Sequence, residues 1–163
     1  MNHFIDYKDI LQKFIQNKIN FVLIGGFAAI AYGVVRVTMD LDLVLSISQT
    51  DLIKAWKTLK KLGFQCRQPI TEKDFTNPKK LTSLIVKKNA KAISFYHKNQ
   101  QYLVVDLLFD KGLNLSDKDI VKLPLFGCIC PVISIDKLIE LKKNAGRPKD
   151  LEDIRELKKI RKK

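Results

Sequence analysis

The segment from residue 21 to residue 45 constrains the fold of this chain more than any other. An apolar run leads into Gly25 and Gly26, a stretch of small residues follows, and a second apolar run carries Asp40 and Asp42. Because side chains alternate across a β-strand, this pattern predicts a strand, a glycine turn, a helix and a second strand that ends in two carboxylates. One face of the second strand is expected to hold Val37, Met39, Leu41, Leu43 and Leu45, and the other Thr38, Asp40 and Asp42.

Two carboxylates on one face need a partner. They repel each other and lose hydration on burial unless a proton or a cation lies between them, and a divalent metal ion is the simplest occupant. A third acid, Asp106, interrupts an apolar run at residues 103–109, where an unpaired carboxylate is costly. Asp110 is the rival to Asp106, but its place before a Lys-Gly turn favours a cap or solvent exposure. We therefore expect a metal site built from Asp40, Asp42 and Asp106.

The glycine pair is the second candidate for ligand binding. Glycine has no side chain, so backbone N–H groups at Gly25 and Gly26 can approach a phosphate, and the start of a helix adds its positive end. The alternative is a tight turn with no ligand. The nearby aspartates favour the phosphate interpretation, because magnesium that bridges phosphates would need them there.

Hydrophobic periodicity predicts the other elements and a mixed α/β fold, with a small mixed β-sheet flanked by helices. Helices are expected over residues 4–17, 27–32, 51–62, 135–144 and 150–160, with Thr50 and Ser134 as caps and with Leu151, Ile154, Leu157 and Ile160 as the apolar stripe of the last one. Strands are expected over residues 21–24, 81–86, 92–96, 102–109 and about 128–130, with a hairpin joining the third and fourth. Residues 69–80 predict a loop.

Length and apolar content predict one domain. The chain has 163 residues, of which 46% are hydrophobic, and this suffices for one core but not for two. We expect a domain over residues 1–163, with a core at about 20–130 and a helical part at about 133–163. No segment reaches the roughly 18 apolar residues of a membrane span, so a soluble cytoplasmic protein is expected. Cys66, Cys128 and Cys130 lack the usual zinc spacing and are expected to be reduced thiols.

The positive charge is large and unevenly distributed. The net charge is +13, and residues 54–98 carry twelve basic side chains against two acidic ones, while residues 137–163 carry eleven against five. A basic surface around an acidic pocket suits a polyanionic substrate that meets bound metal. However, 25 of the 30 basic residues are lysine, a bias that an AT-rich genome alone could generate.

Taken together, these residues resemble the nucleotidyltransferase fold family, the polymerase-beta-like superfamily. The resemblance rests on Gly25-Gly26, Arg36, Thr38, Asp40-Leu41-Asp42 and Asp106, and its form is similar to the bacterial branch of AbiEii-type toxins and small antibiotic nucleotidyltransferases. The run at residues 138–142 and the run at 146–153 resemble the helical ending of that branch. Many members carry Gly-Ser where this chain has Gly25-Gly26.

The resemblance implies an enzyme that moves a nucleoside monophosphate from a nucleoside triphosphate such as ATP to a hydroxyl acceptor. It implies Asp40, Asp42 and Asp106 as catalytic ligands of two Mg²⁺ ions, with Mn²⁺ as a substitute. Triphosphate would be bound by residues of the turn, the second strand and the C-terminal part: Gly25, Gly26, Arg36, Thr38, Lys142 and Arg147. For Lys142 the alternative is a solvated helix face. Asp150 and Asp153 are expected at the start of the last helix, with Arg147 as an ion-pair partner.

Several functional alternatives stay open at this point. The acceptor could be RNA, for example a tRNA end, a protein or a small antibiotic, and the basic segments together with the resemblance to toxins favour RNA. A protein partner such as an antitoxin is also implied. A second class of function is a catalytically weak or inactive nucleotide-binding or nucleic-acid-binding module of a toxin-antitoxin or regulatory complex.

Overall fold

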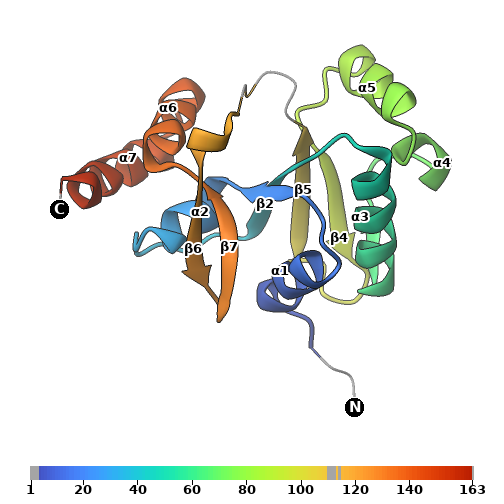
Figure 1. Ribbon diagram of the computed structural model, residues 1–163, viewed down its shortest axis with the longest axis horizontal. Helices are drawn as coiled ribbons and strands as arrows, with labels where there is room; N and C mark the ends of the chain where they lie inside the picture. The colour runs from blue at the N-terminus through green and yellow to red at the C-terminus, as the bar shows by residue number, and fades with distance from the viewer. Residues whose placement is uncertain (1–3, 110–112, 114, 163) are drawn as a thin grey trace.

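A mixed sheet of seven strands forms the centre of the molecule. The computed structural model describes residues 4–109, 113 and 115–162, and the strand order across the sheet is β3-β4-β5-β2-β1-β7-β6 (Figure 1). The β1/β7 and β2/β5 pairs are parallel, and the other neighbouring pairs are antiparallel. The strands are β1 (Phe21–Leu23), β2 (Asp40–Leu45), β3 (Phe64–Cys66), β4 (Ile93–His97), β5 (Val104–Phe109), β6 (Ile120–Leu125) and β7 (Cys128–Ile133).

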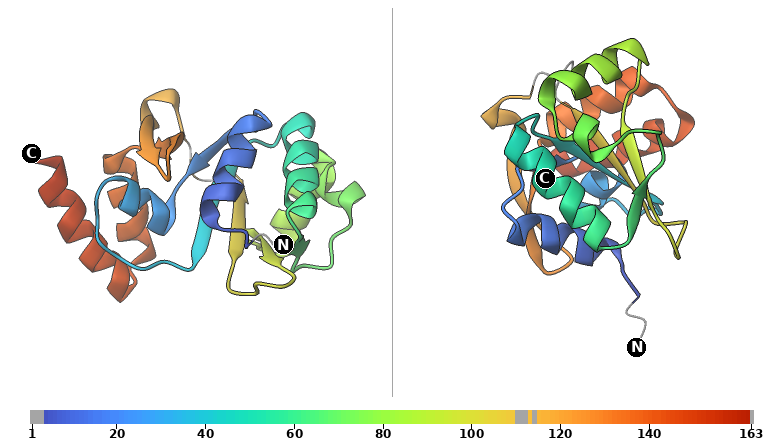
Figure 2. Two further views of the ribbon diagram at one scale, coloured as in Figure 1. Left: turned by 90° about the horizontal axis from the view of Figure 1, so that it is seen from below. Right: turned by 90° about the vertical axis from the view of Figure 1, so that its right-hand side faces the viewer.

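Helices α3 to α7 gather at the two ends of the sheet (Figure 1). Helices α3, α4 and α5 lie together at the end formed by β3 and β4, and α6 and α7 lie at the opposite end of the molecule (Figures 1 and 2). The helices are α1 (Tyr7–Gln16), α2 (Gly25–Ala31), α3 (Gln49–Lys61), α4 (Glu72–Phe75), α5 (Pro78–Lys87), α6 (Ile135–Ala145) and α7 (Pro148–Arg161), with a 3₁₀ turn η1 (Asp117–Asp119). None of these helices is both long and apolar enough to span a membrane, in the ranges that the structure covers.

An aromatic cluster closes the core under α3 and α4. The Phe95 ring of β4 lies 5.6 Å from that of Trp56 in α3 and 5.7 Å from that of Phe75 in α4, measured between ring centroids. Both contacts are edge-to-face, a favoured arrangement for aromatic pairs. One face of the β3–β5 part of the sheet is therefore packed against helices.

The predicted fold class is confirmed, and so are several elements. The hairpin between β4 and β5 forms, with Ile93 opposite Leu107 and Tyr96 opposite Val104. Helix α6 begins after Ser134, whose hydroxyl accepts a hydrogen bond from the backbone N–H of Lys137 at 3.4 Å. The strong hydrophobic periodicity of these segments is what made them predictable.

The region from residue 69 to residue 87 was wrongly predicted as a loop followed by a strand, since it forms α4 and α5. The turn-forming residues there are helix starts: Thr71 caps α4, Asn77 caps α5, and Pro78 occupies the first position of α5. Proline suits that position, because the first N–H of a helix has no intrahelical acceptor. The expected strand at 81–86 thus lies within α5.

Three smaller differences from the sequence-based expectations concern β2, the cap of α3 and β6. Strand β2 begins with the aspartates rather than ending in them, so Val37 and Met39 lie outside the strand and are 85% and 53% exposed. Ser48, not Thr50, caps α3 by accepting from the N–H of Asp51. Strand β6 was not predicted, and it contains Pro124, which the edge of a sheet tolerates.

The apolar stripe of α7 is narrower than the sequence predicts. Leu157 is fully buried and Ile154 is 6% exposed, but Leu151 is 56% exposed. Replacing Leu157 with alanine should lower the free energy of unfolding by about 2–5 kcal/mol, because it removes buried methyl groups and leaves a cavity.

Leu151→Ala is the matched control on the same helix and should change the free energy of unfolding by less than about 0.5 kcal/mol. Urea denaturation followed by circular dichroism measures both. Equal losses for the two variants would contradict the packing of α7 described above.

Candidate functional site

Two of the predicted acids lie side by side on neighbouring parallel strands. Asp42 in β2 is the register partner of Asp106 in β5, and both are half-buried. The Oδ1 atom of Asp106 is buried and has no hydrogen-bond partner among the described residues. Asp40 pairs in register with Val104 and is exposed at the start of β2. Alternation puts Asp40 on the same face of the strand as Asp42.

The two carboxylates of this pair repel each other. Burial first, then the charge of Asp106 and that of Asp40, raise the pKa of Asp42 from 3.8 to about 6, while Arg147 and Lys142 act in the opposite direction. A half-buried carboxyl that faces a second carboxyl holds its proton more tightly, because ionisation would bring two negative charges together with little water between them. A bound cation would remove this cost.

The glycine turn contacts the same carboxylate. Gly25 has a φ of +67°, and a Cβ atom added there would lie 2.0 Å from Oδ2 of Asp42. A Cβ added at Gly26 would lie 2.5 Å from Oγ1 of Thr38. The backbone N–H of Ile24 also donates to the carbonyl oxygen of Asp42 at 3.0 Å. Gly25, Gly26, Thr38 and Asp42, all predicted site residues, therefore form one compact corner at the start of α2.

Asp42 and Asp106 fit a hard divalent cation. Their oxygens are the ligand type that Mg²⁺ prefers, and the unpartnered Oδ1 of Asp106 is the atom that such an ion would satisfy. Within the described ranges, no three His, Cys, Asp or Glu side chains stand close enough to hold an ion together. The structure thus joins Asp42 and Asp106, while Asp40 lies nearby outside that pair. Asp110 lies outside the described residues.

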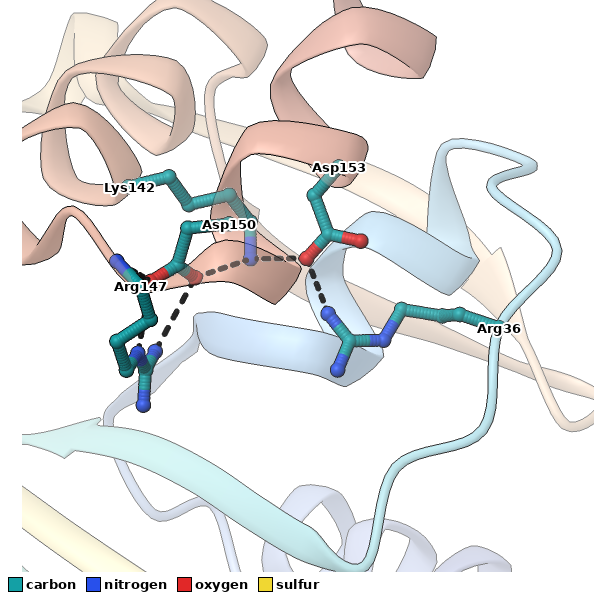
Figure 3. A network of polar contacts seen from close by, with 5 residues as sticks. All are labelled: Arg36, Lys142, Arg147, Asp150 and Asp153. Atoms are coloured by element: carbon teal, nitrogen blue, oxygen red, sulfur yellow. Dashed lines mark hydrogen bonds and ion pairs between the residues drawn. The ribbon is translucent and has the colours of Figure 1, made fainter.

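The predicted basic residues belong to an ion cluster at the C-terminal helices, in which Lys142 is buried and Arg147 is exposed (Figure 3). Asp153 of α7 accepts hydrogen bonds from Arg36 and from Lys142 of α6, the latter at 2.6 Å. Lys142 also lies 3.7 Å from Asp150. The side chains of Lys142 and Asp153 are 5% and 6% exposed, so the alternative of a solvated face is wrong for Lys142.

Arg147 extends this ion cluster toward the carboxylates. Its backbone N–H and its Nε both donate to Oδ2 of Asp150, at 3.2 and 2.7 Å, which confirms the expected ion pair at the start of α7. Burial opposes ionisation of Asp150, but the hydrogen bonds from Arg147 outweigh it and lower its pKa. Three cations and two anions leave the ion cluster with one net positive charge on the side of Asp42.

Sequence reasoning missed the role of Asp153. It placed this residue at the start of α7, but the structure shows Asp153 as the link between Arg36 and Lys142, residues from two distant parts of the chain. The signal that could have found it is its spacing from Asp150, since residues three apart on a helix share a face. The partner 117 residues away has no local signal.

Comparison with solved structures supports the fold, whereas comparison with family models and curated proteins gave no match. No model of a known protein family matches, and no curated protein matches. The crystal structure of lincosamide antibiotic adenylyltransferase LnuA, lincomycin-bound, superposes with a TM-score of 0.65 at 18% identity over 93% of each chain. That of ANT(2")-Ia in complex with adenylyl-2"-tobramycin gives 0.62 at 13% identity over 93% of this chain and 88% of the other.

A third solved structure also superposes on this chain. An antigenic nucleotidyltransferase-like protein from Paracoccidioides brasiliensis superposes with a TM-score of 0.55 at 16% identity, over 94% of this chain and 72% of that one. At such identities the likeness establishes the fold. This chain therefore has the fold of nucleotidyltransferases, as its glycine and aspartate motif predicts.

The raised pKa of Asp42 has a consequence for stability. A carboxyl whose pKa is higher in the folded than in the unfolded state stabilises the fold when it is protonated. This contribution is complete below about pH 3.8 and is lost as the pH rises through about 6. In metal-free protein with a chelator, Asp42→Asn should therefore raise the free energy of unfolding at pH 8, by at most about 3 kcal/mol.

The Asp42→Asn variant should also lose part of the pH dependence of stability between pH 4 and 6. Urea denaturation across this range measures it, and Asp117→Asn, at an exposed aspartate of η1, is the control. A pH profile that is the same for both variants would show that Asp42 is not strained.

The ion cluster gives a separate prediction. Asp153→Asn should lower the free energy of unfolding by about 3–5 kcal/mol. It removes the negative charge that Lys142 and Arg36 share, and so leaves an uncompensated positive charge in a buried environment. The control is Asp136→Asn, which breaks a surface pair with Arg161 and should cost less than about 1 kcal/mol. Thermal and urea denaturation compare the two, and equal effects would mean that the cluster is solvated.

Proposed function

We propose that this protein is a metal-dependent nucleotidyltransferase that moves a nucleoside monophosphate from a nucleoside triphosphate to a hydroxyl group and releases pyrophosphate. The observation that carries this proposal is the pairing of Asp42 with Asp106 directly against the Gly25 turn. A carboxylate pair beside a backbone corner without side chains suits an ion that must contact both protein and phosphate. The fold shared with the adenylyltransferases supports the same reaction class.

Asp42 and Asp106, with Asp40 at the open edge, are the proposed ligands of Mg²⁺, or of Mn²⁺ in its place. When bound, such ions would neutralise phosphate charge and make the acceptor hydroxyl easier to deprotonate. Asp106 is the proposed acceptor of the hydroxyl proton, through the carboxylate oxygen that does not hold the ion. The hydroxyl oxygen attacks the α-phosphorus, the bond from the α-phosphorus to the bridging oxygen breaks, and pyrophosphate leaves with that electron pair.

The remaining site residues are proposed to bind the triphosphate. Backbone N–H groups at Gly25 and Gly26 would approach phosphate oxygens closely, with Thr38 packed behind them. Arg147 is 58% exposed at its side chain while Asp150 holds its Nε, so its remaining guanidinium N–H groups can reach a ligand. Lys142 is committed to Asp153 and would act by adding positive charge near Asp42, while Arg36 would hold Asp153 in place.

A non-catalytic nucleotide-binding module is the second candidate. The observation that favours it is the position of Asp40 outside the Asp42–Asp106 pair, which leaves two close ligands where the predicted site needs three. A partner chain, such as an antitoxin in a toxin-antitoxin complex, would then carry the activity or control it. Two of the solved neighbours are complexes with an antibiotic or an adenylylated antibiotic. A small antibiotic is therefore an alternative acceptor to RNA or protein.

Incorporation of label from α-labelled nucleoside triphosphates tests the proposal. With Mg²⁺ and a mixture of cellular RNA, protein extract, lincosamide and aminoglycoside, the wild type should form a labelled product, and a chelator should prevent this. Asp42→Ala and Asp106→Ala should each lower the rate by at least about 100-fold, because each removes a group that stabilises charge in the transition state.

Asp117→Ala, at an exposed aspartate away from the carboxylate pair, should keep the wild-type rate. If triphosphate raises the melting temperature of the wild type but no acceptor gains label, the protein is the non-catalytic nucleotide-binding module instead of a transferase.

A further inference from the structure

The half of the sheet formed by β3, β4 and β5 has a second face that is not sealed by packing. Phe95 points into the aromatic core under α3 and α4, so its neighbours along β4, Ser94 and Tyr96, point to the opposite side. Ser94 and Tyr96 are half-buried there, and Gln65 and Arg67 beside them are exposed. We call this surface of Gln65, Arg67, Ser94 and Tyr96 the open face.

The open face is continuous with the carboxylate pair. Asp106 is the register partner of Asp42 on one side and of Ser94 on the other, and the backbone N–H of Arg67 donates to the carbonyl oxygen of Ser94 at 2.8 Å. These four residues form one row across the sheet. Because adjacent strands lie about 4.8 Å apart, the backbone of Arg67 is about 10 Å from that of Asp106, within reach of a bound acceptor.

The open face carries an aromatic ring and a guanidinium that are already arranged together. The Cζ atom of Arg67 lies 5.9 Å from the centroid of the Tyr96 ring, and the Tyr96 hydroxyl donates to Oε1 of Gln65 at 3.1 Å. Arg67 thus lies over the face of the Tyr96 ring, and Gln65 binds its hydroxyl. A fixed aromatic ring beside an arginine is the kind of surface on which unpaired nucleobases stack.

Positive charge is concentrated in the segment that runs from α3 to the loop after β4. Residues 54–98 supply ten of the thirteen net positive charges, and the rest of the chain carries eighteen basic and fifteen acidic residues. All twelve basic residues of the segment except Lys54 are exposed. A general preference for lysine would not separate lysine from aspartate and glutamate in this way. Lys87, Lys88 and Lys91 come directly before β4, at the end where Ser94 lies.

We propose that the open face is the acceptor site and that its acceptor is single-stranded RNA, a deepening that rests on the proposed function. Tyr96 and Arg67 stack on a base, Lys87, Lys88 and Lys91 bind backbone phosphates, and a ribose hydroxyl reaches Asp106. Its oxygen forms the new bond to the α-phosphorus, its proton passes to Asp106, and pyrophosphate leaves. A small antibiotic offers no chain of phosphates for Arg67 and these lysines to bind, whereas RNA releases condensed counterions on binding.

Binding is tested first, without nucleotide or metal, so that it does not depend on the reaction. Fluorescence anisotropy of a short fluorescein-labelled single-stranded RNA gives the affinity at several salt concentrations. Tyr96→Ala should weaken binding by at least about fivefold, while Tyr96→Phe, which keeps the ring, should bind as the wild type does. Replacing Lys87, Lys88 and Lys91 together with alanine should reduce the slope of log affinity against log salt by about 2.

The matched control removes the same charge elsewhere. Lys118, Lys122 and Lys158, all exposed, lie on η1, on edge strand β6 and on α7. Their triple alanine variant should leave the salt slope within about 0.5 of the wild type. Melting temperatures of all variants confirm that they are folded. Equal losses of affinity for the two triple variants, or no effect of Tyr96→Ala, would overturn the inference.

Label transfer separates this inference from the function on which it rests. With α-labelled triphosphate, Mg²⁺ and the same RNA, the wild type should label RNA, and Tyr96→Ala should lower the rate mainly through a higher KM for RNA. Label on a lincosamide or aminoglycoside but not on RNA would overturn the acceptor assignment and leave the transferase intact. Binding of RNA at the open face with no label on any acceptor would instead contradict the proposed transferase activity.

Discussion

The parallel pairing of β2 with β5 is the constraint on which the rest of the site depends. It puts Asp42 opposite Asp106, so two carboxylates that repel each other are held in neighbouring strands. The strands can hold them there because their other faces are apolar: Leu41, Leu43, Val105 and Leu107 are all fully buried. Burial of these side chains favours folding and offsets the repulsion between the acids, which persists as a raised pKa of Asp42.

The C-terminal helices supply charge of the opposite sign to this site. Arg36, Lys142 and Arg147 outnumber Asp150 and Asp153, and the surplus lies on the side of Asp42. The same contacts hold α6 and α7 to the segment that precedes β2, because Arg36 is bound to Asp153 (Figure 3). Loss of this link would therefore disturb both the position of the helices and the electrostatics of the carboxylates.

Much of this arrangement could be predicted from the sequence. For the parts that could not be predicted, there are physical reasons. Asp42, Asp106 and the glycine turn were predictable because strand alternation and the cost of a buried acid are local signals. Helix α5 was not, since Asn77 and Pro78 read equally well as a turn or as a helix start, and only packing of the segment decides between them. Strand β6 was hidden by Pro124, which an edge strand accepts.

The ion cluster and the open face depend on contacts between distant parts of the chain. Lys142 follows the pattern of a surface lysine, and its burial comes from two aspartates on the next helix. Similarly, Ser94 and Arg67 carry no motif, and their place in the row with Asp106 follows only from the strand register. The number of close carboxylates also depends on register and backbone course, which is why the structure joins two of the three predicted ligands.

The tight packing at Gly26 makes two positions of this chain interdependent. Any side chain at residue 26 would collide with Thr38, a short and stiff residue that cannot swing away. The hydroxyl of a Gly-Ser turn is therefore sterically excluded here for as long as residue 38 is threonine. A Gly-Ser turn could evolve in this protein only together with a smaller residue at position 38, so the two sites would have to change as a pair.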